Sequence, residues 1–371
     1  MAQTKAAAGL TVEQWDSEFF REYLTENRFA NEFGSNENSI IQTKESLTTK
    51  KGDKVNFALI NKLSNKATTG SATLEGNEEN ITSRSFGVTV DKRRNGVVVA
   101  EIEEQKSAID LREGGRAVLM DWAQKDTEIL IMKALASKNG VIYTSASEAQ
   151  RDAWLVDNAD RTLFGALRSN ASSLDHSTAL ATLDTTDDRF NAAAVSKMKA
   201  IAESVASPRI RPTKSSGMTN GKRYYCIYAH SYAFDDLKTD TVIQQAQREV
   251  ALQMENVRLF DGGDLYWDGC IIKKISETDE DGNHPWDYGL VGDTSAQVVG
   301  AFLVGAQAIG AAYARRWRTQ EEKFDYGDKQ GIAVSSIYGI EKMRFGSGIA
   351  DTDDYKDHGV VSGYFATNGL S

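Results

Sequence analysis

Two stretches of alternating apolar residues, separated by a long polar segment, constrain this chain more than any other feature. The first carries Val55, Phe57 and Leu59 at every second position, and the second, Phe86–Ala100, begins with the same alternation. A period of two is typical of a β-strand with one apolar face. The segment between them is rich in glycine, asparagine and threonine, as turns are. The pattern predicts an extended hairpin over residues 48–106, with arms that reach about 33 Å.

A hairpin of two strands is marginally stable in water unless it lies on another surface. The sequence shows no other obvious use for such a hairpin. We therefore expect the hairpin to contact another subunit, and Val55, Phe57 and Leu59 are the predicted contact residues.

The N-terminal segment, residues 1–47, is predicted to be an arm that carries an amphipathic helix. Trp15, Phe19 and Tyr23 recur at every fourth position, which places three aromatic rings on one helix face. This stripe has two alternative partners: a neighbouring subunit, which is our prediction, or the chain's own long helix.

Residues 107–138 are predicted to form one long helix, because apolar residues recur there at helical spacing. Residues 139–297 mix helices and strands, and residues 298–371 return to strands. There is no internal repeat, and the predicted class is α+β. The clearest expected elements after the long helix are a helix near 191–206 and strands at 222–229, 265–276, 298–304, 331–338 and 360–365.

Composition is that of a folded protein of about two domains, with 371 residues, of which 40% are apolar and 26% are charged. The formal charge is −10. A nucleic-acid-binding protein concentrates Lys and Arg on one face, whereas the two basic clusters here, Lys92–Arg94 and Arg315–Arg318, are short and have acidic neighbours. They favour solvated strand ends or ion pairs between subunits over contact with DNA.

The cysteines and the N-terminal residues favour synthesis in a reducing cytoplasm. The two cysteines, Cys226 and Cys270, lie in apolar strand-like runs and are expected to be buried free thiols. The N-terminus lacks an apolar core of signal-peptide length. The apolar run 298–314 is shorter than the ~20 residues that span a membrane, so it predicts a buried strand followed by a closely packed small-residue segment.

No motif in the sequence predicts catalysis, a cofactor or a metal. The four histidines are scattered, with no pair at zinc-ligand spacing. The stretch 216–223 resembles a phosphate-binding loop but has Arg223 where a hydroxyl is needed and a strand where a helix should follow. The stretch 277–288 resembles a calcium loop but ends on Tyr288 in place of the bidentate glutamate, so a turn between strands is predicted.

Several short segments of the sequence resemble those of the major capsid proteins of tailed bacteriophages, in the N-4-type branch. The most specific is TLEGNEENITSRSFGVTVDKRR, which follows a strand that starts KGDKVNFALINKL. The helix LREGGRAVLMDWAQKDTEILIMKAL and the stretches NADRTLFGAL and YYCIYAHSYAFDDLKTD support the resemblance, which extends from about Trp15 to Phe365.

This resemblance implies the HK-97-type capsid fold. In that fold, residues 1–47 are the N-terminal arm, 48–106 the extended E-loop, 107–138 the spine helix of the peripheral (P) domain and 139–297 mainly the axial (A) domain. Residues 298–371 return to the P domain at a boundary that the sequence does not place. The covalent Lys–Asn cross-link of some relatives has no matching motif here and is not predicted.

The resemblance also implies self-assembly into the pentamers and hexamers of an icosahedral phage head, built in the host cytoplasm around double-stranded DNA. A portal protein, a separate scaffolding protein and cement proteins are the partners that it implies. The alternatives are an encapsulin-type compartment shell, which shares the fold, a cytosolic enzyme of unknown class, and a secreted adhesin.

Overall fold

The computed structural model describes residues 27–48, 52–61, 63, 65–107, 110–205, 208–213, 223–253, 260–261, 264–346 and 355–369. These residues form two compact units. The described parts of unit 1 are chiefly Lys92–Thr127 and Arg315–Ile337, and unit 2 comprises Arg28–Asp91, Glu128–Ala314 and Tyr338–Ser371. The mixture of helices and sheets confirms the α+β class.

An eight-stranded sheet forms the centre of unit 2. Its inner strands come from continuous apolar runs, which predict burial on both faces. Every residue of β17 is buried, and so is every residue of β12 after the first. The strands in sheet order are β6 (Thr162–Phe164), β17 (Val360–Thr367), β12 (Gln297–Val304), β7 (Tyr225–His230), β10 (Cys270–Ile275), β9 (Asp264–Trp267) and β8 (Phe260–Asp261), with β11 (Asp287–Gly289) paired to β12.

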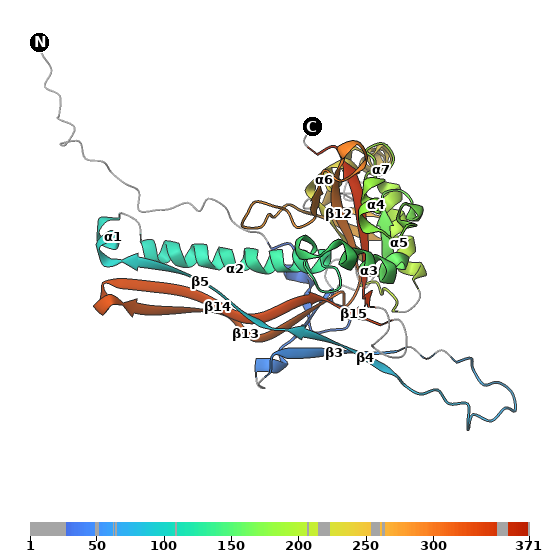
Figure 1. The fold of residues 1–371 in the computed structure, drawn as a ribbon, viewed down its shortest axis with the longest axis horizontal. Coiled ribbons are helices and arrows are strands. Elements are labelled where there is room, and N and C mark those ends of the chain that lie inside the picture. The colour runs from blue at the N-terminus through green and yellow to red at the C-terminus, as the bar shows by residue number, and fades with distance from the viewer. Residues whose placement is uncertain are drawn as a thin grey trace, which may run out of the picture. The chain divides into compact units, whose positions relative to one another are not determined.

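Helices cover this sheet, as the green and yellow ribbons around β12 in Figure 1 show. Apolar residues of α5 and α6, among them Met198 and Phe234, belong to the same buried cluster as the strands. Side chains cap the helix starts: Asn191 accepts from the backbone N–H of Ala194 at the start of α5. The helices are α3 (Glu148–Asn158), α4 (His176–Ala181), α5 (Ala192–Ser204), α6 (Ser231–Thr239) and α7 (Thr241–Gln253).

The predicted hairpin is present but shorter than expected. The antiparallel strands β3 (Lys54–Ile60) and β4 (Ser83–Thr89) pair from Lys54 with Thr89 to Ile60 with Ser83. The expectation that one arm continues to residue 100 was wrong, because the chain after β4 pairs with β14 and not with β3. The chain continues as β5 (Asp91–Ala100), which lies beside β14 in another sheet, and then as the short helix α1 (Glu101–Lys106).

The described part of unit 1 is the first part of a long helix packed on strands. The predicted long helix is confirmed as α2 (Leu111–Ala136), and Figure 1 shows its first part running along β5, β13 and β14. Trp122 of α2 meets Trp317 of β13 edge to face, with ring centroids 5.9 Å apart. Leu119, Ile332 and Val334 complete this small core. These strands belong to a five-stranded sheet with the order β1 (Phe33–Gly34), β2 (Ile41–Lys44), β13 (Ile309–Phe324), β14 (Lys329–Lys342) and β5. Of these, β1, β2, the first part of β13 and the last part of β14 are counted in unit 2.

The remaining sequence expectations are largely confirmed. The apolar run 298–314 forms β12 and the buried start of β13, so its small-residue part is also a strand. Within the described residues, no helix combines the length and the apolar character that a membrane crossing requires. Cys226 and Cys270 are buried free thiols. A separate two-stranded ladder joins β15 (Arg344–Phe345) to β16 (Lys356–Asp357).

Candidate functional site

The predicted contact residues of the hairpin are mostly turned toward their own chain. Val55 and Phe57 are only 4% and 1% exposed, and Leu59 is half-buried. They pack in one cluster with Met343 and Phe345. The alternation was interpreted correctly as one apolar face, but unit 2 itself covers that face. Any surface that the hairpin offers to another subunit therefore lies on other residues.

The exposed apolar residues of the hairpin lie at the end of β3 and in the segment that connects it to β4. Ile60 at the end of β3 is 70% exposed, and Leu74 and Ile81 in the connecting segment are 63% and 76% exposed. The segment has local structure, since the backbone N–H of Asn77 donates to the carbonyl of Leu74 at 2.9 Å. Gly76 provides the positive φ that this turn needs. Exposed apolar side chains that gather on one connecting segment are typical of a contact surface.

The aromatic stripe of the arm, Trp15, Phe19 and Tyr23, lies outside the described residues. The same holds for most of the phosphate-loop-like stretch 216–223. The contact between subunits through the arm therefore stays a prediction.

The fold brings together two histidines that sequence spacing did not relate. The rings of His230 and His284 lie 4.1 Å apart between centroids. In each ring Nδ1 accepts a backbone N–H, from Tyr232 and from Trp286 respectively. Burial lowers the pKa of His230 to about 4 and that of His284 to about 3. Both are neutral core side chains near pH 7, and their Nδ1 atoms are already engaged.

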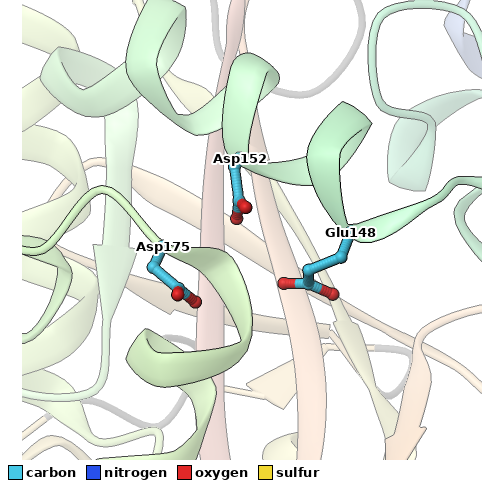
Figure 2. A group of neighbouring side chains, drawn as sticks. All are labelled: Glu148, Asp152 and Asp175. Atoms are coloured by element: carbon cyan, nitrogen blue, oxygen red, sulfur yellow. The ribbon is translucent and has the colours of Figure 1, made fainter.

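One group of carboxylates in the described residues has the spacing of metal ligands. Figure 2 shows Glu148 and Asp152 on α3 facing Asp175, which precedes α4, and their oxygens lie within 4.8 Å of one another. Each also accepts a backbone N–H at the start of α4: Asp175 from Thr178 at 2.8 Å, Asp152 from His176 at 2.8 Å and Glu148 from Ser177 at 3.0 Å. The cluster thus caps a helix.

The hydrogen bond from Thr178 holds the pKa of Asp175 below its ordinary value. Arg151 lies 3.4 Å from Glu148 and supplies a positive charge to the cluster. These contacts account for the three carboxylates as helix caps, so we assign no cation to them. Sequence reasoning missed the group because Asp175 is far from α3 along the chain.

A buried ion pair fixes the end of α2. Lys342 Nζ lies 2.6 Å from Asp357 Oδ2, and both side chains are almost fully buried. Lys342 also donates to the carbonyls of Leu135 at 3.3 Å and Ser137 at 2.8 Å. An ammonium there satisfies carbonyls that the helix leaves without partners and complements its dipole. Trp154 Nε1 donates to the same Asp357 oxygen at 2.9 Å.

A second buried lysine lies beside this pair. Lys138 Nζ is 3.3 Å from the ring centroid of Trp154 and hydrogen-bonds to the hydroxyl of Tyr364. Burial, and then the charge of Lys342, hold the pKa of Lys138 well below its ordinary value. Two lysines with one carboxylate serve the fold here, because Lys138, Lys342 and Asp357 are each at most 2% exposed.

The calcium-loop-like stretch is a turn, as predicted. Asp279 Oδ1 accepts the backbone N–H groups of Asp281 at 3.1 Å and Asn283 at 2.8 Å, and Gly282 has a positive φ. An aspartate that bonds the backbone two residues on is typical of such turns.

Comparisons with known proteins agree over the whole length. A family model described as phage capsid protein matches residues 3–367. The major capsid protein of Pseudomonas phage KPP25 is 29% identical over 374 residues, which cover 97% of this chain and 96% of that protein. Among solved structures, the capsid asymmetric unit of cyanophage Pam1 superposes with a TM-score of 0.85 at 29% identity, over all of both chains.

A more distant structure supports the fold alone. The capsid of Ralstonia phage GP4 has a TM-score of 0.76 at 23% identity, again over all of both chains. These neighbours confirm the expected HK-97-type capsid fold, with a long helix on strands, a hairpin and a separate mixed sheet. The chain belongs to the phage capsid protein family.

Proposed function

We propose that this chain is the major capsid protein of a tailed phage. Copies of it assemble as pentamers and hexamers into an icosahedral head, built in the host cytoplasm, that encloses double-stranded DNA. The observation that carries this proposal is the family match over residues 3–367. The likeness to the Pam1 capsid over the full chain supports it. The encapsulin-type alternative is not favoured, because both relatives are phage capsid proteins.

The described elements support a proposal for the domain roles. We assign α2 with β5, β13 and β14 to the P domain, the eight-stranded sheet with its helices to the A domain, and the hairpin β3–β4 to the E-loop. The hairpin supports a role in contacts between subunits, because Leu74 and Ile81 remain exposed in the single chain. A second proposed contact is the arm, through Trp15, Phe19 and Tyr23.

The role is structural rather than enzymatic. In the described residues, the carboxylates of Figure 2 cap a helix, and Lys342 and Asp357 bind each other. Proposed partners are a portal protein, a scaffolding protein and cement proteins, with DNA held without sequence specificity. We expect no cofactor.

Electron microscopy of the purified full-length chain, expressed alone and with the phage's scaffolding protein, tests the proposal. Closed shells of uniform diameter are the expected result. Folded monomers that never assemble under either condition would contradict it.

A matched pair of variants tests the arm. Trp15→Ser with Phe19→Ser is expected to weaken shells while the circular dichroism of the subunit stays near that of the unmodified chain. An unfolded subunit would instead show that the stripe packs on the chain's own core. Thr11→Ser, in the same segment but outside the stripe, is the control.

A further inference from the structure

Strand β5 carries an Asn–Gly pair and is the last strand in the described order of its sheet. Every second backbone N–H of such an edge strand points away from the sheet. The N–H of Glu101, directly after β5, bonds the carbonyl of Asp328, directly before β14, at 2.8 Å. Gly96 lies an odd number of residues earlier, so its N–H points to the open edge. A Cβ on Gly96 would lie 3.3 Å from that of Ala333, which agrees with the close side-chain approach of a pair without ladder hydrogen bonds.

The outward N–H of Gly96 meets the side chain of the residue before it. It donates to Asn95 Oδ1 at 2.8 Å. Because a carbonyl bond is about 1.2 Å long, the Gly96 nitrogen lies at most about 4 Å from Asn95 Cγ. Both residues are exposed, so water reaches this amide. Gly96 also has no Cβ to hinder a close approach. The backbone nitrogen is thus held beside the carbonyl carbon with which it can close a five-membered ring.

Another Asn–Gly pair, Asn139–Gly140, is held in a different way. It forms the turn after α2, which is closed by hydrogen bonds from the N–H of Lys138 to the carbonyl of Val141 at 2.8 Å and in return at 2.9 Å. Both turn residues have a positive φ, as tight hairpin turns require. Asn139 Oδ1 is shielded from solvent, and Lys138 is fully buried. Rotating the Asn139 side chain and backbone into a reactive arrangement would therefore break this turn.

We propose that Asn95 is a site of spontaneous deamidation in the folded chain, and that the fold protects Asn139. The Gly96 nitrogen gives up its proton to solvent base and bonds to Asn95 Cγ. The Cγ–Nδ2 bond then breaks, and the nitrogen leaves as ammonia after taking up a proton. Water opens the cyclic imide at either of its two carbonyls and leaves aspartate or isoaspartate. Each event consumes one water and releases one ammonia, and the short approach between the reacting groups favours it.

The products change both the charge and the backbone of β5. Each replaces a neutral amide by a carboxylate, and isoaspartate also inserts an additional carbon into the main chain. Val97, two residues on, packs with Leu119 and Trp122 under α2. A closely packed core transmits such a displacement, so isoaspartate at position 95 loosens this cluster. The inference concerns a single folded subunit and does not depend on the proposed function.

Peptide mapping measures the reaction at each site. The folded full-length chain is incubated in mildly alkaline buffer made with water enriched in the heavy oxygen isotope, so each deamidation event leaves a labelled carboxylate. Trypsin cleaves after Arg94 and Lys138, which places Asn95 and Asn139 in separate peptides without a second asparagine. Asn95 should react at least about tenfold faster than Asn139, because Asn139 must first lose the hydrogen bonds of its turn.

Two controls separate the fold from the dipeptide. In guanidinium chloride the chain is unfolded, so the two asparagines should react at similar rates. The variant Asn95→Gln should give no labelled product at position 95, because the longer side chain closes its ring far more slowly. Its reaction at Asn139 should match that of the unmodified chain.

The effect on the core is tested with a matched variant. Asn95→Asp carries the new charge without the additional main-chain carbon. Chains with isoaspartate at position 95, separated by ion exchange, should unfold at a lower denaturant concentration than Asn95→Asp. Equal midpoints would overturn the proposed effect on the core. The proposed site itself is overturned if Asn95 reacts no faster than Asn139 in the folded chain, or if the same excess persists in the unfolded chain.

Discussion

The central sheet of unit 2 and the strands of unit 1 differ in how many of their faces are buried. All eight residues of β17 are buried. In β13, by contrast, every residue from Arg316 onward except the half-buried Trp317 is exposed. The sequences already differ in this way, since β17 reads VVSGYFAT and the distal part of β13 reads RWRTQEEKF. The first pattern completes a core within one subunit, and the second leaves a face for something else.

This difference separates folding from assembly. Substitutions in the buried sheet and its neighbours should act on the stability of a single subunit. Substitutions on the exposed face of unit 1 or on the hairpin tip should act on shells while leaving the subunit folded. Each prediction below concerns unassembled subunits at low concentration unless stated otherwise.

The largest effect is expected from Asp357→Ala in unit 2. It leaves the ammonium of Lys342 buried without its counter-charge, and breaking one half of a buried pair costs about 3–5 kcal/mol. Urea unfolding followed by tryptophan fluorescence measures the loss. The double variant Lys342→Met with Asp357→Leu should be less destabilised, because the ammonium of Lys342 is removed together with its counter-charge. Equal losses in both variants would contradict the ion-pair explanation.

Phe57→Ala tests whether the apolar face of the hairpin stabilises the subunit or the contact between subunits. Phe57 is almost fully buried in its own chain, so the subunit should lose about 3–4 kcal/mol of unfolding free energy. The interpretation drawn from sequence alone, that Phe57 contacts another subunit, predicts instead a stable subunit that fails to assemble. Urea unfolding together with electron microscopy distinguishes the two.

Acid should weaken unit 2 selectively, because all four histidines of the chain belong to it. Burial lowers the pKa of His176 to about 2, that of His230 to about 4, and those of His284 and His358 to about 3. Below pH ~6.5 the unfolded chain then binds protons that the folded chain does not. Unfolding free energy therefore falls with pH, by about 1.4 kcal/mol per pH unit for each such histidine.

His176→Phe tests this linkage at one site. His176 lies among aromatic rings, 5.6 Å from Phe164 between ring centroids, so phenylalanine keeps the packing. Between pH 7 and 5 the variant should lose about 2 kcal/mol less stability than the unmodified chain, which is one histidine's share. Urea unfolding at the two pH values measures the difference. An unchanged pH dependence would show that His176 does not titrate with unfolding.

The smallest effect on the subunit is expected at the hairpin tip. Ile81→Ser changes a side chain that is 76% exposed, so unfolding free energy should move by less than about 0.5 kcal/mol. Shell yield, measured by sedimentation, should nevertheless fall. Thr69→Ser, in the same connecting segment, is the control. A destabilised subunit would place Ile81 in the chain's own core.

Periodicity in the sequence was enough to locate most elements and the fold class. The long helix is α2, the apolar run 298–304 is β12, and the helix near 191–206 is α5. Hydrophobic spacing is a local property, so it can be recognised without knowing how the rest of the chain folds. The resemblance to phage capsid proteins added the fold and the family, which periodicity alone does not supply.

Tertiary structure decided what lies against each of these elements. The alternation of Val55 and Phe57 predicted an apolar face, but only the fold shows that Met343 and Phe345 cover it. Lys138 meets Tyr364 across more than half of the sequence, and His230 meets His284 because β7 and β10 are neighbours in the sheet. The physical reason is that strand order and long-range packing set such contacts, and neither leaves a pattern in the local sequence.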